Sequence, residues 1–186
     1  MVWVAAVFVA IMVHELGHGM VFRYVFRVSA RIVLHGAGGL AIPLAHRYRK
    51  PGFKGFFSEV LLSASGVLAG FALALFVLLF YWTGITHLFG EGALTSLLSL
   101  FFTNLVFVCV VWGIFNILPI YPLDGGHIAR EVLCSISPRT GVANSLALSI
   151  FVAALVAILW IRIGTFFNAA LFAYLAFLSW KELERS

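Results

Sequence analysis

Residues 2–26 have the sequence VWVAAVFVAIMVHELGHGMVFRYVF, an apolar run that contains the pentapeptide HELGH at residues 14–18. The run is long enough to cross a bilayer as one helix. Ionisable side chains at membrane depth are costly and usually mark function. In a helix, residues four apart lie on one face, so His14 and His18 can hold one metal ion, with Glu15 beside them as a general base. The segment therefore predicts a metal-dependent hydrolase in a membrane.

The composition is that of an integral membrane protein. Of 186 residues, 63% are hydrophobic and 10% are charged, and the mean hydropathy is +1.09. These values lie outside the range of soluble globular proteins. Five stretches are long and apolar enough to span a bilayer, namely 2–26, 59–82, 95–118, 141–161 and 163–180. We expect an all-α polytopic membrane protein, and we expect the first segment to be retained because its polar motif is foreign to a signal peptide.

The chain is expected to form a single membrane-embedded domain over residues 1–186. Its core covers 1–135, and 141–180 supplies accessory helices that pack against lipid and neighbouring helices. The connection at Trp160–Gly164 is very short. The sequence leaves open whether 141–180 is two helices or one broken helix.

The distribution of charge predicts an orientation. Twelve Lys and Arg against seven Asp and Glu give a net charge of +5, which in a membrane protein indicates orientation and not nucleic-acid binding. Seven of the twelve lie between the first two spans: Arg23, Arg27, Arg31, Arg47, Arg49, Lys50 and Lys54. The positive-inside rule then places the N-terminus outside and the C-terminus in the cytoplasm, with Arg162 as the one exception among twelve. A basic surface of this kind also suits anionic lipid headgroups.

The long connection 27–57 contains a hairpin signal. Arg31–His35 and Leu40–Leu44 are short apolar runs on either side of Gly36-Ala37-Gly38-Gly39. Such a pattern predicts a small β-hairpin or a re-entrant strand pair at the membrane surface. Open sheet edges cannot face lipid, so the hairpin must be covered by protein or line a wet cavity, where its edge can pair with an extended substrate. A plain amphipathic connector is the alternative.

A hydrolytic zinc site needs a third protein ligand and one open position. Among the acidic residues, only Asp124 adjoins the cytoplasmic end of a span without a nearby exit. The stretch 116–126 contains two prolines and two glycines, which disfavours a continuous helix. The charge-based topology places Asp124 on the same side as the second half of the first span. Two alternatives remain: Asp124 caps a helix that begins near Gly126, or His127 is a ligand or supports one.

These motifs together resemble the site-2 protease family of intramembrane zinc metalloproteases. The resemblance rests on HELGH near the start, Leu123-Asp124-Gly125 after a later span, and Asn116 eight residues before Asp124. The small-residue stretch Ser65–Gly70 is also similar, although Val67 stands where the family often has proline. The resemblance covers the chain from the first span to about residue 135 and implies a minimal form without a PDZ or CBS domain.

The resemblance implies residue roles. His14, His18 and Asp124 would bind one Zn²⁺ per chain, Glu15 would be the catalytic acid and base, and Asn116 would hold the substrate or the developing oxyanion. We further expect the strand edge around Gly38 and Gly39 to bind substrate. The implied substrate is a transmembrane protein in the lipid bilayer, cleaved within or next to its span in regulated intramembrane proteolysis. By family analogy the location is a prokaryotic cell membrane, with the active site toward the cytoplasmic half, and a separate regulatory membrane protein is a possible partner.

Two other functions compete with this prediction. A transporter for zinc or another divalent cation would use the same His14, His18 and Asp124, but it would need no base at Glu15, and transporters usually show internal repeats that this chain lacks. A catalytically inactive scaffold that presents membrane proteins is the second alternative. His35 is expected at the surface or at the substrate edge, and His46 and His87 are expected in loops.

Overall fold

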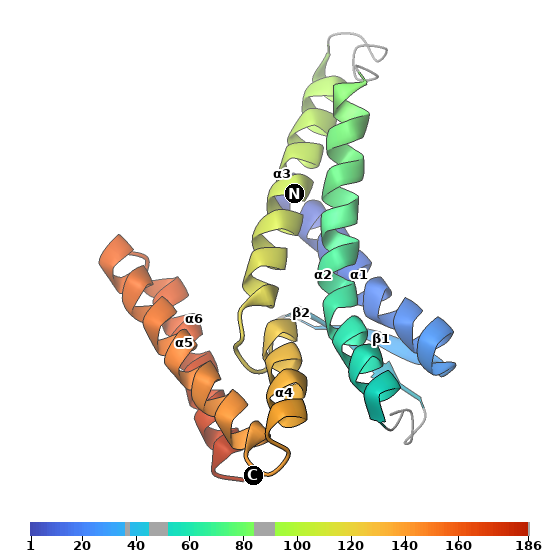
Figure 1. The fold of residues 1–186 in the computed structure, drawn as a ribbon. Coiled ribbons are helices and arrows are strands. Elements are labelled where there is room, and N and C mark those ends of the chain that lie inside the picture. The colour runs from blue at the N-terminus through green and yellow to red at the C-terminus, as the bar shows by residue number, and fades with distance from the viewer. Residues whose placement is uncertain (36–37, 45–51, 84–91, 186) are drawn as a thin grey trace. The chain divides into compact units, whose positions relative to one another are not determined.

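The computed structural model describes residues 1–35, 38–44, 52–83 and 92–185. The described part of the chain is mostly helical, with one small sheet (Figure 1). In chain order the elements are α1 (Val2–Val21), the π-helical turn η1 (Phe22–Phe26), β1 (Ala30–His35), β2 (Gly38–Pro43), α2 (Gly52–Trp82), α3 (Ala93–Ile117), α4 (Asp124–Ile136), α5 (Gly141–Ile163) and α6 (Phe166–Leu183). The predicted fold class is confirmed.

Four helical segments within the described ranges are long and apolar enough to cross a membrane. They are Val2–Phe26, Gly55–Trp82, Ala93–Ile117 and Gly141–Ile163. The fifth predicted span, 163–180, corresponds to α6, which is a helix but is not among these four. Its last turn contains Lys181 and Glu182, which shorten the apolar stretch.

The chain divides into two compact units. One comprises Met1–Tyr48 and Ser65–Ile114, and the other comprises Arg49–Ala64 and Phe115–Ser186. Each unit has its own apolar cluster and is described separately. The single-domain organisation expected from the sequence stays a prediction.

In the first unit, small residues of α1 let the helices approach closely. Ala6 and Ala10 pack with Ala74 and Val77 of α2 and with a group on α3, comprising Leu105, Val108 and Cys109. Small side chains at helix contacts are typical of membrane bundles, because close backbone approach increases van der Waals contact. Further along, Tyr81 of α2 and Ser99 of α3 share a hydrogen bond between their hydroxyls.

The hairpin predicted after the first span is present in the same unit. Strands β1 and β2 are antiparallel, with Ala30 opposite Pro43 and His35 opposite Gly38. Gly38 and Gly39, which the sequence suggested for the turn, belong to β2. Both strands contact α1, so the hairpin is covered by protein on that side, as the cost of unsatisfied backbone in lipid requires.

In the second unit, α5 and α6 are two helices that pack side by side (Figure 1). Gly164 ends α5 with a positive φ of 86°, a conformation that glycine adopts without strain. This answers the question that the sequence left open. The core of the unit is a cluster to which α5, α6 and the segment before α4 contribute: Ile120, Ala153, Ala157, Phe172 and Leu175.

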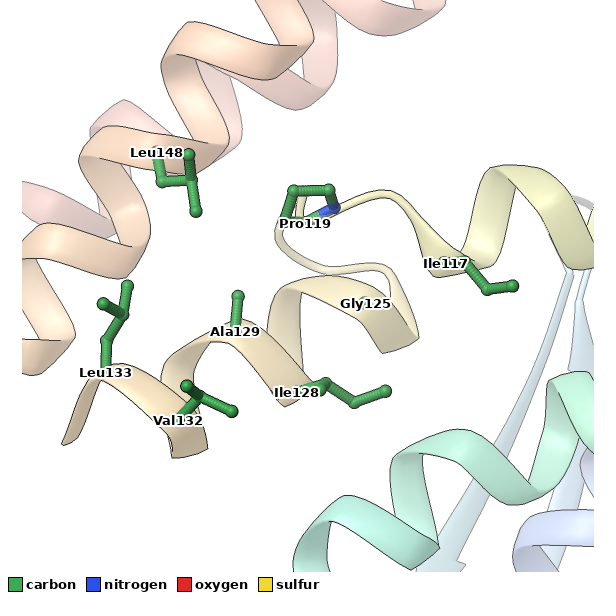
Figure 2. A pocket seen from close by; sticks show the side chains of 8 residues that line it. All are labelled: Ile117, Pro119, Gly125, Ile128, Ala129, Val132, Leu133 and Leu148. Atoms are coloured by element: carbon green, nitrogen blue, oxygen red, sulfur yellow. The ribbon is translucent and has the colours of Figure 1, made fainter. Parts of the chain in front are cut away.

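An apolar cavity of ≈ 430 Å³ lies within the second unit (Figure 2). It is bounded by the end of α3, one face of α4 and Leu148 of α5. Its other lining residues are Ile117, Pro119, Gly125, Ile128, Ala129, Val132 and Leu133. Almost all of the lining is hydrocarbon, so the cavity offers no polar chemistry of its own.

Candidate metal centre

The two histidines of HELGH face each other on α1. Their Nε2 atoms are 3.2 Å apart, and their rings meet edge to face, with centroids 4.9 Å apart. His14 is buried, with 6% of its surface exposed, and His18 is half-buried. The helical spacing of four residues is therefore used as the sequence predicted, to bring two imidazole nitrogens together inside the protein.

Residues of helix α2 lie next to these nitrogens. A Cβ added at Gly66 would lie 2.6 Å from His14 Nε2 and closer still to His18 Nε2. Ser65, the preceding residue, has its hydroxyl 3.3 Å from His18 Nδ1. The absence of a side chain at Gly66 thus leaves space at the nitrogen pair, while Ser65 holds the far side of the His18 ring.

The close approach of α2 to α1 depends on Gly17. A Cβ at this position would collide with the carbonyl oxygen of Ser65 and would lie 2.9 Å from Ala69 Cβ. Gly17 is buried. Because only a residue without a side chain permits this contact, the glycine inside HELGH sets how near Ser65 and Gly66 come to the histidines.

This geometry fits a divalent metal. With Zn–N bonds of about 2.0–2.1 Å and tetrahedral angles, two nitrogen ligands of one zinc ion are separated by about 3.3 Å. The two Nε2 atoms stand at 3.2 Å, beside space that a Cβ would fill. When Nε2 binds a metal, Nδ1 carries the proton, so His18 Nδ1 would donate to Ser65 Oγ, the usual support for a metal-bound histidine.

Glu15 lies under strand β2. It is 6% exposed, and a Cβ added at Gly39 would lie 2.7 Å from its Cδ and 2.8 Å from Oε1. Gly39 therefore makes room for the carboxylate. The hairpin residue that the sequence marked for substrate binding is in direct contact with the predicted general base.

Asn116 and Asp124, which the sequence also predicted for the site, belong to the second unit. Asn116 is buried near the end of α3, with 8% exposed, and Asp124 is the first residue of α4. The N-cap of α4 is Leu123, which makes no side-chain cap hydrogen bond, and Asp124 lies in the first turn, so Asp124 is not the N-cap residue. His127 is exposed, and its ring packs against Tyr121 at 5.8 Å.

The structure thus brings together His14, His18, Glu15 and Gly39 within one unit, and places Asn116 and Asp124 in the other. The structure does not describe the side chains of Leu34 and His35 or the burial of Gly38. His46, Arg47, Arg49, Lys50 and His87 lie entirely outside the described residues. Sequence reasoning gave no role to Ser65 and Gly66, although it singled out their small-residue stretch.

Comparison with known proteins supports a protease. Residues 83–160, which include Asn116 and Asp124, match the model of Peptidase family M50. Among solved structures, the chain is similar to the Site-2 Protease from Methanocaldococcus jannaschii, with a TM-score of 0.57, 21% sequence identity and coverage of 99% of this chain and 76% of that chain. The structural likeness shows a shared fold, and the family match agrees with the resemblance read from the sequence. No curated protein sequence matches it.

The match to Peptidase family M50, together with the apolar helices, supports a membrane metalloprotease. A peptidase of family M50 uses a divalent metal, for which zinc is typical, and the donor set at His14 and His18 suits that ion. The apolar helices make the chain an integral membrane protein. Its substrates are expected among proteins of the same bilayer.

Proposed function

We propose that the chain is an intramembrane zinc metalloprotease that cleaves a peptide bond within or next to a transmembrane segment of another membrane protein. The observation that carries the proposal is the space at Gly66, which faces the Nε2 atoms of His14 and His18 at a separation suited to one zinc ion. The M50 match supports the reaction class. It names a peptidase, and the transporter alternative has no such support.

The proposed zinc ligands are His14, His18 and Asp124, one ion per chain. The Lys and Arg distribution puts the second half of the first span and the end of the third span on the cytoplasmic side. Asp124 follows the third span by seven residues, so in this topology we expect it on the same side of the bilayer as the second half of the first span. Three protein ligands leave one position for water, the arrangement that hydrolytic zinc sites use.

In the proposed mechanism, zinc would supply positive charge that acidifies water and polarises the peptide carbonyl. Glu15 accepts the proton of the attacking water and later donates it to the leaving amine. Its burial keeps the carboxylate away from bulk solvent, and the contact with Gly39 fixes its position. Asn116, buried on α3, would donate its amide hydrogens to the substrate or to the developing oxyanion.

The substrate segment must unwind before cleavage, because carbonyls in a transmembrane helix are held in helical hydrogen bonds. Each strand of a two-stranded sheet has one edge without a strand partner among the described residues. We propose that the outer edge of β2, around Gly38 and Gly39, pairs with the unwound segment. Because Gly39 contacts Glu15, a segment bound there would lie next to the base.

The charge pattern supports the orientation that we propose, and the remaining parts of the proposal follow from the family resemblance. The N-terminus would lie outside and the C-terminus in the cytoplasm of a prokaryotic cell membrane, with the active site toward the cytoplasmic half. Cleavage there would release the cytoplasmic part of a membrane protein, as regulated intramembrane proteolysis requires. A separate membrane protein would provide the regulation.

The test is cleavage of single-span membrane proteins by the full chain in liposomes, with the cut mapped by mass spectrometry. We expect cuts inside or beside the apolar span that a zinc chelator blocks and added zinc restores. Glu15→Gln is expected to slow cleavage at least about 100-fold while zinc content stays at the wild-type level. Undiminished cleavage by Glu15→Gln would refute the mechanism. Zinc uptake into vesicles without any cleavage would favour a transporter.

A further inference from the structure

We infer that Ser149 of α5 and Ser179 of α6 are positioning residues for the metal centre: together they clamp the non-helical segment that leads into Asp124. This inference rests on the proposed function, because it takes Asp124 as a zinc ligand. It assigns to α5 and α6 a role beyond the packing that the sequence suggested for them.

Ser149 bridges two backbone groups of the segment. Its hydroxyl donates to the carbonyl of Pro119 at 3.1 Å and accepts from the backbone N–H of Tyr121 at 2.7 Å. The side chain is 1% exposed. One hydroxyl thus uses both its donor and its acceptor capacity on the same turn of chain, which fixes the turn in position as well as in conformation.

Ser179 holds the same turn from the other helix. Its hydroxyl lies 3.2 Å from the carbonyl oxygen of Tyr121 and 2.9 Å from that of Leu175, one turn back in α6. The single hydroxyl proton is shared between these two acceptors. Tyr121 therefore has its N–H bonded to Ser149 and its C=O bonded to Ser179, and Ser179 is fully buried.

The segment needs such partners because hydrogen bonds within it do not satisfy all of its backbone groups. Pro119 and Pro122 interrupt the helical hydrogen bonds between α3 and α4. A buried, unbonded peptide group costs about 1–3 kcal/mol, and more in a lipid environment. Ser149 and Ser179, on two neighbouring helices, remove that cost at Tyr121. The adjacent Ile120 is fully buried in the core of the unit, with 0% of its surface exposed.

The clamp is connected to Asp124 through a short, tightly bonded run of backbone. The N–H of Leu123 bonds to the carbonyl of Ile120 at 2.7 Å, and the N–H of Gly126 bonds to the carbonyl of Leu123 at 3.0 Å. A Cβ at Gly126 would lie 2.6 Å from the Ile120 carbonyl group. With so little freedom between the clamped turn and α4, the place of Tyr121 determines where α4 begins, and the Asp124 side chain projects from that first turn.

The test is zinc affinity of the full chain in detergent, measured by competition with a chromophoric chelator. Ser149→Ala is expected to weaken zinc binding about five- to tenfold, and Ser179→Ala less, because its proton is shared with its own helix. Ser145→Ala is the matched control: it is one turn earlier on α5, 3% exposed, and its hydroxyl bonds to Val142 of the same helix. Ser149→Cys keeps nearly the same volume with a weak hydrogen-bonding group, and it covers the case in which Ser149→Ala does not fold.

The outcomes separate this inference from the proposed function. If Ser149→Ala, Ser149→Cys and Ser179→Ala all bind zinc as tightly as Ser145→Ala, while Asp124→Ala binds it weakly, the clamp has no role at the metal and the inference is overturned. A purely structural role would lower thermal stability without changing zinc affinity. If Asp124→Ala binds zinc as tightly as wild type, Asp124 is not a ligand and the proposed function itself is wrong in that respect.

Discussion

The substitution Gly66→Ala tests the metal centre most sharply among changes outside the ligands. The added Cβ would stand 2.6 Å from His14 Nε2, whereas real Cβ contacts essentially never fall below 3.0 Å and ordinary contacts begin at 3.4 Å. The histidine ring must therefore retreat by at least about 0.4 Å, and by about 0.8 Å for an ordinary contact. Metal–ligand distances tolerate only about ±0.2 Å. The new methyl group also fills the space that the ion needs.

We expect Gly66→Ala to weaken zinc binding at least about 100-fold, since even changes in groups that only support ligands cost 10–100-fold. Folding is not expected to suffer, because alanine is favoured over glycine inside a helix by about 1 kcal/mol. The control is Gly70→Ala, one turn along α2, where the new Cβ meets only the Cys109 carbonyl oxygen at 3.8 Å. Chelator competition and thermal unfolding are measured on both. Equal zinc affinity in the two variants would refute the assignment of the space at Gly66 to a metal.

Two further predictions concern the base and the core. Gly39→Ala would push the Glu15 carboxylate, whose Cδ stands 2.7 Å from the new Cβ; a misplacement of this size costs about 100-fold in the rate of cleavage, measured by single-turnover proteolysis with zinc content unchanged. Gly19→Ala is its control, because there the Cβ meets only Ile32 at 3.7 Å, and equal loss in both variants would contradict the role of Gly39. Phe172→Ala, at a position 2% exposed in the second unit's core, should lower the free energy of unfolding by about 3 kcal/mol. Phe177→Ala, 49% exposed, should lower it far less in the same denaturation assay, and a similar loss would show that the core is elsewhere.

Much of the fold could be predicted from periodicity and length. The runs 95–118 and 141–161 correspond closely to α3 and α5, because long apolar stretches in a membrane have one stable backbone solution. Helix α2 begins at Gly52, seven residues before the predicted 59. The sequence did not show this start because Lys54 and Ser58 lower the mean hydropathy of the first two turns. The hairpin was predicted, but its strand β2 takes in Gly38 and Gly39, which glycine content alone suggested for the turn.

The sequence predicted the residues that carry the chemistry of the candidate site, but it did not predict the residues that support them. His14, Glu15 and His18 are visible because ionisable groups in an apolar helix need a reason. Gly66 is not, because a glycine in a membrane helix has many uses, and only the structure shows that its missing side chain leaves space at the histidine nitrogens. Ser149 and Ser179 are similar: serines in apolar helices often bond to their own helix, and their bonds to Tyr121 depend on tertiary packing.

The proposed function depends most on one zinc ion that is held by His14, His18 and Asp124. X-ray absorption spectroscopy of the zinc-loaded full chain tests this directly. We predict two imidazole nitrogens at about 2.0–2.1 Å and a carboxylate oxygen at a similar distance, with one imidazole lost in His14→Ala and the carboxylate lost in Asp124→Ala. A zinc environment that is unchanged in Asp124→Ala, or that contains no imidazole in the wild-type chain, would contradict it.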